Sequence, residues 1–142
     1  MYIIPEEMKQ QLMEKARFML SRSYIPYSHF AVGAALLAED DQIFTGCNVE
    51  NAGFSGTNCA ERTAVFKAVS EGVRTFKAIA IVGGKDRKPT GECAPCGVCR
   101  QVLREFVDPK EFVILLGTGP DDIHEYTLEE LLPKSFGPEN LT

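Results

Sequence analysis

The chain has 142 residues, of which 44% are apolar and 25% charged, values typical of one folded domain and not of a disordered or fibrous protein. Its net charge of −5 at pH 7 argues against nucleic acid as a partner, because such binding rests largely on cations that meet phosphates. No apolar run approaches the roughly 20 residues that a membrane helix needs. We therefore expect a single domain over residues 1–142 that takes a small substrate and no membrane partner.

The cysteines and the first residues indicate a compartment. The chain has five cysteines, and its polar start lacks the apolar core of a signal peptide. Disulfides are rare in proteins that stay inside the cell, where thiols are kept reduced. We therefore expect a cytoplasmic protein with free thiols.

Hydrophobic periodicity predicts strands that alternate with helices. The first element is an amphipathic helix from Pro5 to about Ser21, with two glutamates in its first turn. After a loop over 21–28, we expect hairpin strands over 30–38 and 42–49, an irregular segment over 50–58 and a helix over 59–70. Next come a strand over 78–82 ended by Gly83-Gly84, a polar loop over 85–94, and a helix from 95 or 96 to 106. The last elements are a strand over 112–116, a weak strand over 124–126 and a short helix over 128–132 that Thr127 and Glu130 cap. This order predicts a layered α/β fold, and the hairpin favours a mixed sheet.

Two cysteine-containing segments carry the chemistry, Cys59-Ala60-Glu61 and Pro95-Cys96-Gly97-Val98-Cys99. Both open predicted helices, where unpaired backbone N–H groups and the helix dipole favour thiolate over thiol. If the two helix ends converge, they supply three thiolates to one zinc ion. A catalytic zinc site of this kind keeps its fourth position for water.

Each motif also has other interpretations. The Cys96–Cys99 segment alone could be a thioredoxin-like redox pair, and Cys93 could join Cys59 and that segment in a closed four-thiolate structural site. Glu61 could serve only as a capping residue, because it lies three positions after Asn58. The combination of the two segments favours the open, catalytic zinc site.

The sequence resembles the small cytidine deaminases from about Met8 to Phe136. Zinc deaminases share the signature H-x-E…P-C-x-x-C, with cysteine allowed in the first place, as here. The segments that carry the resemblance are Pro26–Phe30, Val32–Ala35, Thr45–Asn51, Cys59–Ala64, Lys67–Gly72, Pro95–Gln101 and Glu130–Pro133. The resemblance implies a three-layer α-β-α fold with a mixed, mostly five-stranded sheet. It also implies one Zn²⁺ per subunit, bound by Cys59, Cys96 and Cys99.

The same resemblance implies an activity, the hydrolytic deamination of cytidine and deoxycytidine to uridine and deoxyuridine in pyrimidine salvage. Zinc-bound hydroxide would attack C4 of the base, with Glu61 as the proton shuttle. The residues implied to bind the nucleoside are Phe30, Asn48, Glu50, Ala60, Phe54 and Phe136. Asn48 and Glu50 would bind the ribose hydroxyls, and Phe30 would pack against the pyrimidine. The family also implies a homotetramer with shared active sites, for which Phe54 and Phe136 are the candidate aromatic residues from neighbouring subunits.

Three thiolates and a hydroxide around Zn²⁺ sum to an excess negative charge, which would weaken the activation of water. Arg62 and Arg100 adjoin the two motifs, and we expect both to offset this charge by hydrogen-bonding the thiolates. Two other functions stay open. One is a related zinc deaminase for another nucleoside or base, of the blasticidin type, and the other is a structural-zinc module without enzymatic activity.

Overall fold

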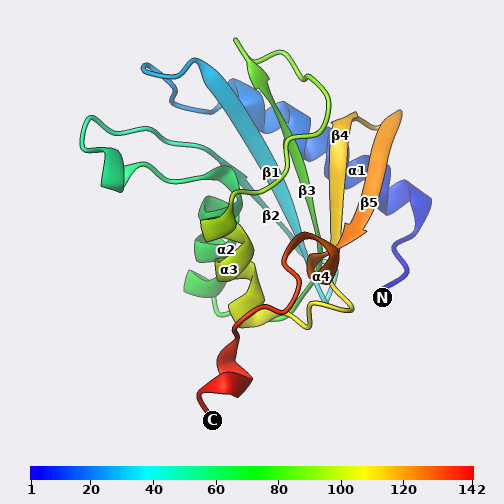
Figure 1. Ribbon diagram of the computed structural model, residues 1–142. Coiled ribbons are helices and arrows are strands. Elements are labelled where there is room, and N and C mark those ends of the chain that lie inside the picture. The colour runs from blue at the N-terminus through cyan, green and yellow to red at the C-terminus, as the bar shows by residue number, and fades with distance from the viewer.

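A five-stranded mixed sheet forms the middle layer of the structure, a computed structural model that describes residues 1–142 (Figure 1). The strands are β1 (Phe30–Ala38), β2 (Ile43–Cys47), β3 (Phe76–Lys85), β4 (Val113–Gly119) and β5 (Asp122–Thr127). Their order across the sheet is β2-β1-β3-β4-β5. Only β3 and β4 are parallel neighbours, and every other neighbouring pair is antiparallel.

Helices cover both faces of this sheet. On one face lie α1 (Glu6–Phe18) and the short 3-10 turn η1 (Met19–Ser21), and on the other lie α2 (Ala60–Ser70), α3 (Gly97–Phe106) and α4 (Leu128–Leu131) (Figure 1). Alternate residues of β1 point to opposite faces: Leu36 belongs to the core beneath α2 and α3, and Leu37 to the core beneath α1. The predicted three-layer α-β-α fold is therefore confirmed.

Strand directions bring the starts of α2 and α3 to the same edge of the sheet. β2 and β3 each pair antiparallel with β1, so they run in the same direction. α2 follows β2 along the chain and α3 follows β3, so each helix begins near the carboxyl end of its preceding strand. This edge is where ligands commonly bind in α/β sheets.

A close contact between β2 and α2 fixes the start of α2. A Cβ atom at Gly46 would lie 2.3 Å from the carbonyl oxygen of Ala60 and 2.6 Å from the backbone nitrogen of Ala64. Only glycine lets the helix backbone approach the strand this closely. The first turn of α2 is thereby held directly on the end of β2.

The prediction that Gly83-Gly84 ends the third strand is wrong, since β3 continues to Lys85. The reason is a loop that folds back on the strand and needs room there. A Cβ atom at Gly83 would lie 2.6 Å from the Cys93 sulfur, and one at Gly84 would lie 1.7 Å from the Lys88 carbonyl oxygen. These glycines therefore serve close packing and do not break the strand. No helix of the structure is both long and apolar enough to cross a bilayer.

Candidate active site

Three cysteine sulfurs from two helix starts lie together at this edge. The Sγ atoms of Cys59 and Cys96 are 3.9 Å apart, those of Cys96 and Cys99 are 3.6 Å apart, and all three lie within 4.8 Å of one another. A tetrahedral zinc ion with Zn–S bonds of about 2.3 Å holds its sulfurs roughly 3.8 Å apart. The three thiols therefore fit zinc, the cofactor that the sequence predicts.

Both helix starts leave the cysteine side chains free for this role. Cys59 is the N-cap residue of α2 and Cys96 the N-cap residue of α3, and both have extended backbone conformations. Neither side chain makes a capping hydrogen bond to its own helix. The helix dipoles at both ends favour the thiolate form that a metal needs.

Arg62 acts on the cluster directly, because a guanidinium nitrogen donates to the Cys59 sulfur at 3.2 Å. Hydrogen bonds from the Cys99 thiol and from Arg62 lower the pKa of Cys59 to about 5. The pKa of Cys99 is raised, because its thiol donates a hydrogen bond to Cys59 and because it is buried. A divalent cation at the cluster adds positive charge that favours thiolate at all three positions.

Glu61, the second residue of α2, is only 4% exposed, and its Oε1 atom has no hydrogen-bond partner in the protein. Burial, with a smaller contribution from the nearby Cys59 charge, raises the pKa of Glu61 to about 7. An unpaired buried carboxylate oxygen is costly, so its presence beside the thiols indicates a position where a ligand binds. The capping interpretation is wrong, because the N-cap residue is Cys59 and not Asn58, and α2 has no capping box.

Arg100 does not donate to a thiol. Its Nε donates to the Pro95 carbonyl oxygen at 2.6 Å, and its Nη1 donates to the Leu131 carbonyl oxygen at 2.5 Å. The expected hydrogen bond to a thiolate is thus replaced by two hydrogen bonds to the main chain, which sequence spacing alone does not reveal.

The fourth sulfur near the motif, that of Cys93, lies outside the cluster. It packs against Gly83 of β3, and burial raises the pKa of its thiol to about 11. The metal-binding group contains Cys59, Cys96 and Cys99 alone. A closed four-thiolate site is therefore excluded, and one position of a tetrahedral metal stays open.

Asn48 follows β2 and fastens the start of β1. Its Nδ2 donates to the Phe30 carbonyl oxygen at 2.8 Å, and its Oδ1 accepts from the Val32 N–H at 2.9 Å. An amide side chain has two donors and an oxygen with two lone pairs, so each end keeps capacity for a ligand. The family resemblance predicts ribose binding for Asn48 and does not reveal these contacts with β1.

Glu50 holds the loop before β1. One carboxylate oxygen accepts from the N–H groups of Tyr27 at 3.0 Å and Ser28 at 3.1 Å, and the other accepts from the Ser28 hydroxyl. The hydrogen bond from Ser28 is the main cause that lowers the pKa of Glu50. The side chain is therefore a partly exposed anion whose orientation the loop fixes.

The four remaining predicted residues differ in exposure. Ala60 is fully buried in the first turn of α2, and Phe30 is 40% exposed where β1 begins. Phe54 is 84% exposed on the 3-10 turn η2 (Phe54–Gly56), and Phe136 is 57% exposed after α4. The segment with η2 and the segment after α4 both project from the domain (Figure 1).

Comparison with known proteins agrees with this site. The family described as "Cytidine and deoxycytidylate deaminase zinc-binding region" matches residues 6–116. The chain is 49% identical to a cytidine deaminase of Sporosarcina psychrophila over 94% of both chains, and 46% identical to one of Halalkalibacterium halodurans over 94% of this chain and 97% of the other. The crystal structure of cytidine deaminase from Burkholderia pseudomallei superposes with a TM-score of 0.80 at 44% identity, covering 89% of this chain and 97% of that one.

The match to the family extends over most of the chain and includes both cysteine segments and Glu61. The protein belongs to the cytidine and deoxycytidylate deaminase family. Its three-cysteine cluster is the zinc site that the family description names.

Proposed function

We propose that the protein is a zinc-dependent cytidine deaminase that hydrolyses cytidine and deoxycytidine to uridine or deoxyuridine and ammonia. The observation that carries this function is the three-thiol cluster with the unpaired oxygen of Glu61 beside it. Cytidine deaminases that share nearly half of the sequence over nearly the whole chain support the same activity.

In this mechanism Cys59, Cys96 and Cys99 hold the zinc, which supplies a Lewis acid that makes water nucleophilic near neutral pH. Glu61 removes a proton from the attacking water and delivers it to N3 of the pyrimidine, which activates C4. The oxygen of that water bonds to C4, and Glu61 then transfers the remaining proton of the new hydroxyl to the 4-amino group, which leaves as ammonia as the C4 carbonyl forms. The low exposure of Glu61 keeps bulk water from competing for these protons.

For substrate binding, the Asn48 amide donates to a ribose hydroxyl and the Glu50 carboxylate accepts from the ribose hydroxyls. Phe30 packs against the pyrimidine, and the buried Ala60 lines the base pocket. Support comes from the two polar side chains, which the start of β1 and the preceding loop hold in place while leaving hydrogen-bonding capacity on each. Such a preorganised pair recognises a sugar at little entropic cost.

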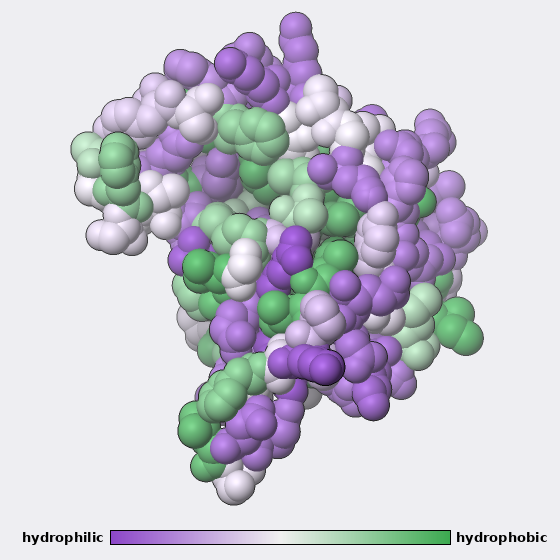
Figure 2. Space-filling model, in the orientation of Figure 1, coloured by the Kyte–Doolittle hydropathy of each residue, from purple (hydrophilic) through white to green (hydrophobic).

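The proposal includes a homotetramer in which Phe54 and Phe136 reach the active sites of neighbouring subunits. An apolar groove on α2 and α3 supports it, lined by Phe66, Val98, Val102 and Phe106. Figure 2 shows apolar side chains gathered over these helices and on the projecting segments. A cytoplasmic location belongs to the same proposal, since three sulfurs within 4.8 Å of one another would be prone to oxidation outside a reducing compartment.

Metal content and turnover measured on one sample test the function. We expect one zinc per chain, loss of cytidine absorbance on incubation, and loss of turnover when a chelator removes the metal. Bound zinc without turnover of any nucleoside or base would instead indicate the structural-zinc module. Turnover of another nucleoside or base but not of cytidine would indicate the related deaminase.

Mixed oligomers test the shared sites. Glu61→Gln subunits and Phe136→Ala subunits are each expected to be weakly active alone. After subunit exchange, activity should rise, because some sites then combine an intact Glu61 with an intact Phe136. No recovery in tetramers shown to be mixed would contradict the shared sites.

A further inference from the structure

Cys96 is the thiol of the cluster with the least support from neighbouring side chains. Cys99 is buried, and Cys59 receives a hydrogen bond from Arg62. Cys96 is exposed, and its only side-chain partners are the other two sulfurs. Whatever keeps this sulfur aimed at the metal position therefore acts through the main chain of Cys96.

Arg100 holds both carbonyl groups that flank the α-carbon of Cys96. Its backbone N–H donates to the Cys96 carbonyl oxygen at 3.0 Å, and its Nε donates to the Pro95 carbonyl oxygen at 2.6 Å. These carbonyls belong to the two rigid peptide planes that meet at Cys96. Fixing both planes fixes φ and ψ of Cys96, observed at −65° and 167°, and with them the direction in which its side chain leaves the backbone.

The guanidinium is itself anchored on a well-fixed element. Its Nη1 donates to the carbonyl oxygen of Leu131, the last residue of α4. The start of α4 is secured by a capping box between Thr127 and Glu130, and Leu128 is fully buried in the core. Arg100 therefore ties the segment before α3 to a second helix that is tightly held.

We propose that Arg100 is a positioning residue for the zinc site, which acts by orienting the main chain of Cys96 and not by neutralising a thiolate. Replacing a group that orients a metal ligand typically costs 10–100-fold in metal affinity or activity. This inference rests on zinc binding by the three thiols. It does not depend on which nucleoside is the substrate.

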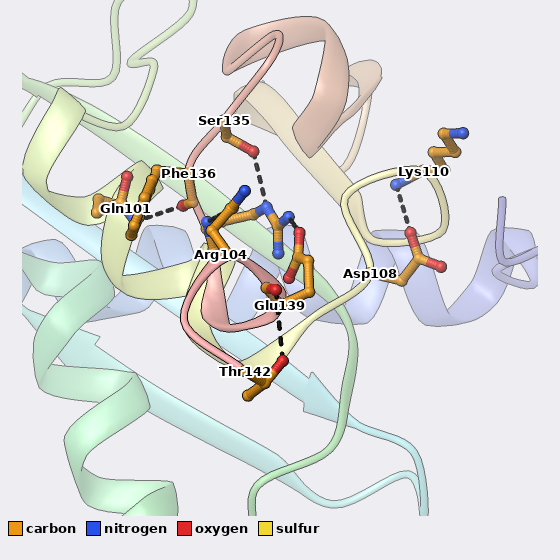
Figure 3. A network of polar contacts seen from close by, with 10 residues as sticks. Gln101, Arg104, Asp108, Lys110, Ser135, Phe136, Glu139 and Thr142 are labelled. Atoms are coloured by element: carbon orange, nitrogen blue, oxygen red, sulfur yellow. Dashed lines mark hydrogen bonds and ion pairs between the residues drawn. The ribbon is translucent and has the colours of Figure 1, made fainter.

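Arg104 provides a matched control one helical turn later on α3. Figure 3 shows its guanidinium within the segment that follows α4, where its Nε donates to the Ser135 hydroxyl at 2.7 Å and a terminal nitrogen pairs with Glu139. Both arginines thus fasten residues after β5 to α3. Only Arg100 also binds the Pro95 carbonyl, so replacing Arg104 loosens the same segment without freeing the peptide before Cys96.

The test is the rate at which zinc-loaded protein releases its metal to an excess of a chromogenic chelator, measured without nucleoside. We expect Arg100→Gln to release zinc about tenfold faster or more. Arg100→Lys should fall between Arg100→Gln and the unchanged protein, because an ammonium cannot bridge two carbonyls with a planar fork. Arg104→Gln should release zinc at the unchanged rate, even if it unfolds at a lower temperature.

Cobalt substitution gives a second readout, because its visible absorption reports the geometry of the ligand sulfurs. The cobalt spectrum should change in Arg100→Gln and not in Arg104→Gln. Unchanged release from Arg100→Gln, or equal acceleration in Arg104→Gln, would overturn the inference. If Arg100→Gln does not fold, Arg100→Lys decides by the same comparison with Arg104→Gln.

The outcome is separable from that of the proposed function. Faster zinc release from Arg100→Gln in a protein that turns over no cytidine would support the positioning role and contradict the activity. Unchanged release in a fully active enzyme would contradict the positioning role alone.

Discussion

The two helix starts that form the metal site are held in different ways. At the start of α2, side chains contact the cluster: Arg62 donates to the Cys59 sulfur, and Glu61 is buried beside the thiols. At the start of α3, the exposed Cys96 is oriented by hydrogen bonds to its flanking carbonyls. The α2 side therefore places a cation and a buried carboxylate beside the thiols, while the α3 side contributes two of the three sulfurs, of which Cys96 is oriented through its main chain.

The largest expected effect comes from breaking the chemistry on the α2 side. Glu61→Gln keeps the shape of the side chain but removes its ability to accept a proton, so turnover should fall on the order of 10²–10⁴-fold or more. Zinc content should stay at one per chain, because the metal-binding group consists of Cys59, Cys96 and Cys99 and does not include Glu61. Steady-state assays with metal analysis check this, and normal turnover in Glu61→Gln would refute the proton route.

The next effect concerns how α2 is seated on the sheet. Gly46→Ala places a Cβ atom 2.3 Å from the Ala60 carbonyl oxygen, so the first turn of α2 has to shift. We expect a loss of about 1–3 kcal/mol in the free energy of unfolding. Zinc release should also be faster, because Cys59 moves with the helix. Denaturant unfolding measures the free energy of unfolding, and chelator competition measures the rate of zinc release. An unchanged free energy of unfolding would show that the close contact at Gly46 does not require glycine.

A smaller effect is expected where β2 leads into the proposed sugar site. Asn48→Ala should raise KM for cytidine roughly tenfold, the cost of about 1.4 kcal/mol in binding. The KM for free cytosine should hardly change, because cytosine has no ribose. Since Asn48 also fastens the start of β1, the ratio of the two effects is the decisive measurement. An equal rise for both substrates would remove Asn48 from ribose recognition.

The smallest effect is the counterpart of Gly46→Ala at the other helix start. A Cβ atom at Gly97, the first residue of α3, would meet nothing within 4 Å. Gly97→Ala should therefore raise the free energy of unfolding by about 0.4–1 kcal/mol, because the unfolded chain loses freedom. The same unfolding experiment compares the two glycines. A loss as large as that of Gly46→Ala would mean that the two helix starts are equally constrained.

Local signals allowed most of the site to be predicted. Short motifs identify the cysteines at two helix starts and Glu61. Arg62 lies one helical turn from Cys59, so the spacing of the two residues predicts its contact with that sulfur. The contact of Arg100 with the Leu131 carbonyl is not predictable in this way, because Leu131 is 31 residues away along the chain. From spacing alone, a thiolate and a carbonyl are equally accessible to that guanidinium.

The wrong prediction of where β3 ends has a similar cause. Gly83-Gly84 has the composition of a strand end, and only the loop that packs Cys93 against Gly83 explains why glycine lies inside β3. The hydrogen bonds that Asn48 and Glu50 make to β1 and its preceding loop are likewise not predictable from the sequence, because they depend on pairing between distant segments. Sequence patterns report what a residue does within its own helix or strand, and contacts between elements lie beyond them.

The position of β3 links formation of the sheet to metal binding as the chain folds. β3 lies between α2 and α3 along the chain and between β1 and β4 in the sheet. Bringing Cys59 and Cys96 together therefore closes a loop that contains this middle strand, at an entropic cost. Because zinc binding by these cysteines is coupled to folding, we expect tight zinc uptake by a refolding chain to accompany formation of the central sheet.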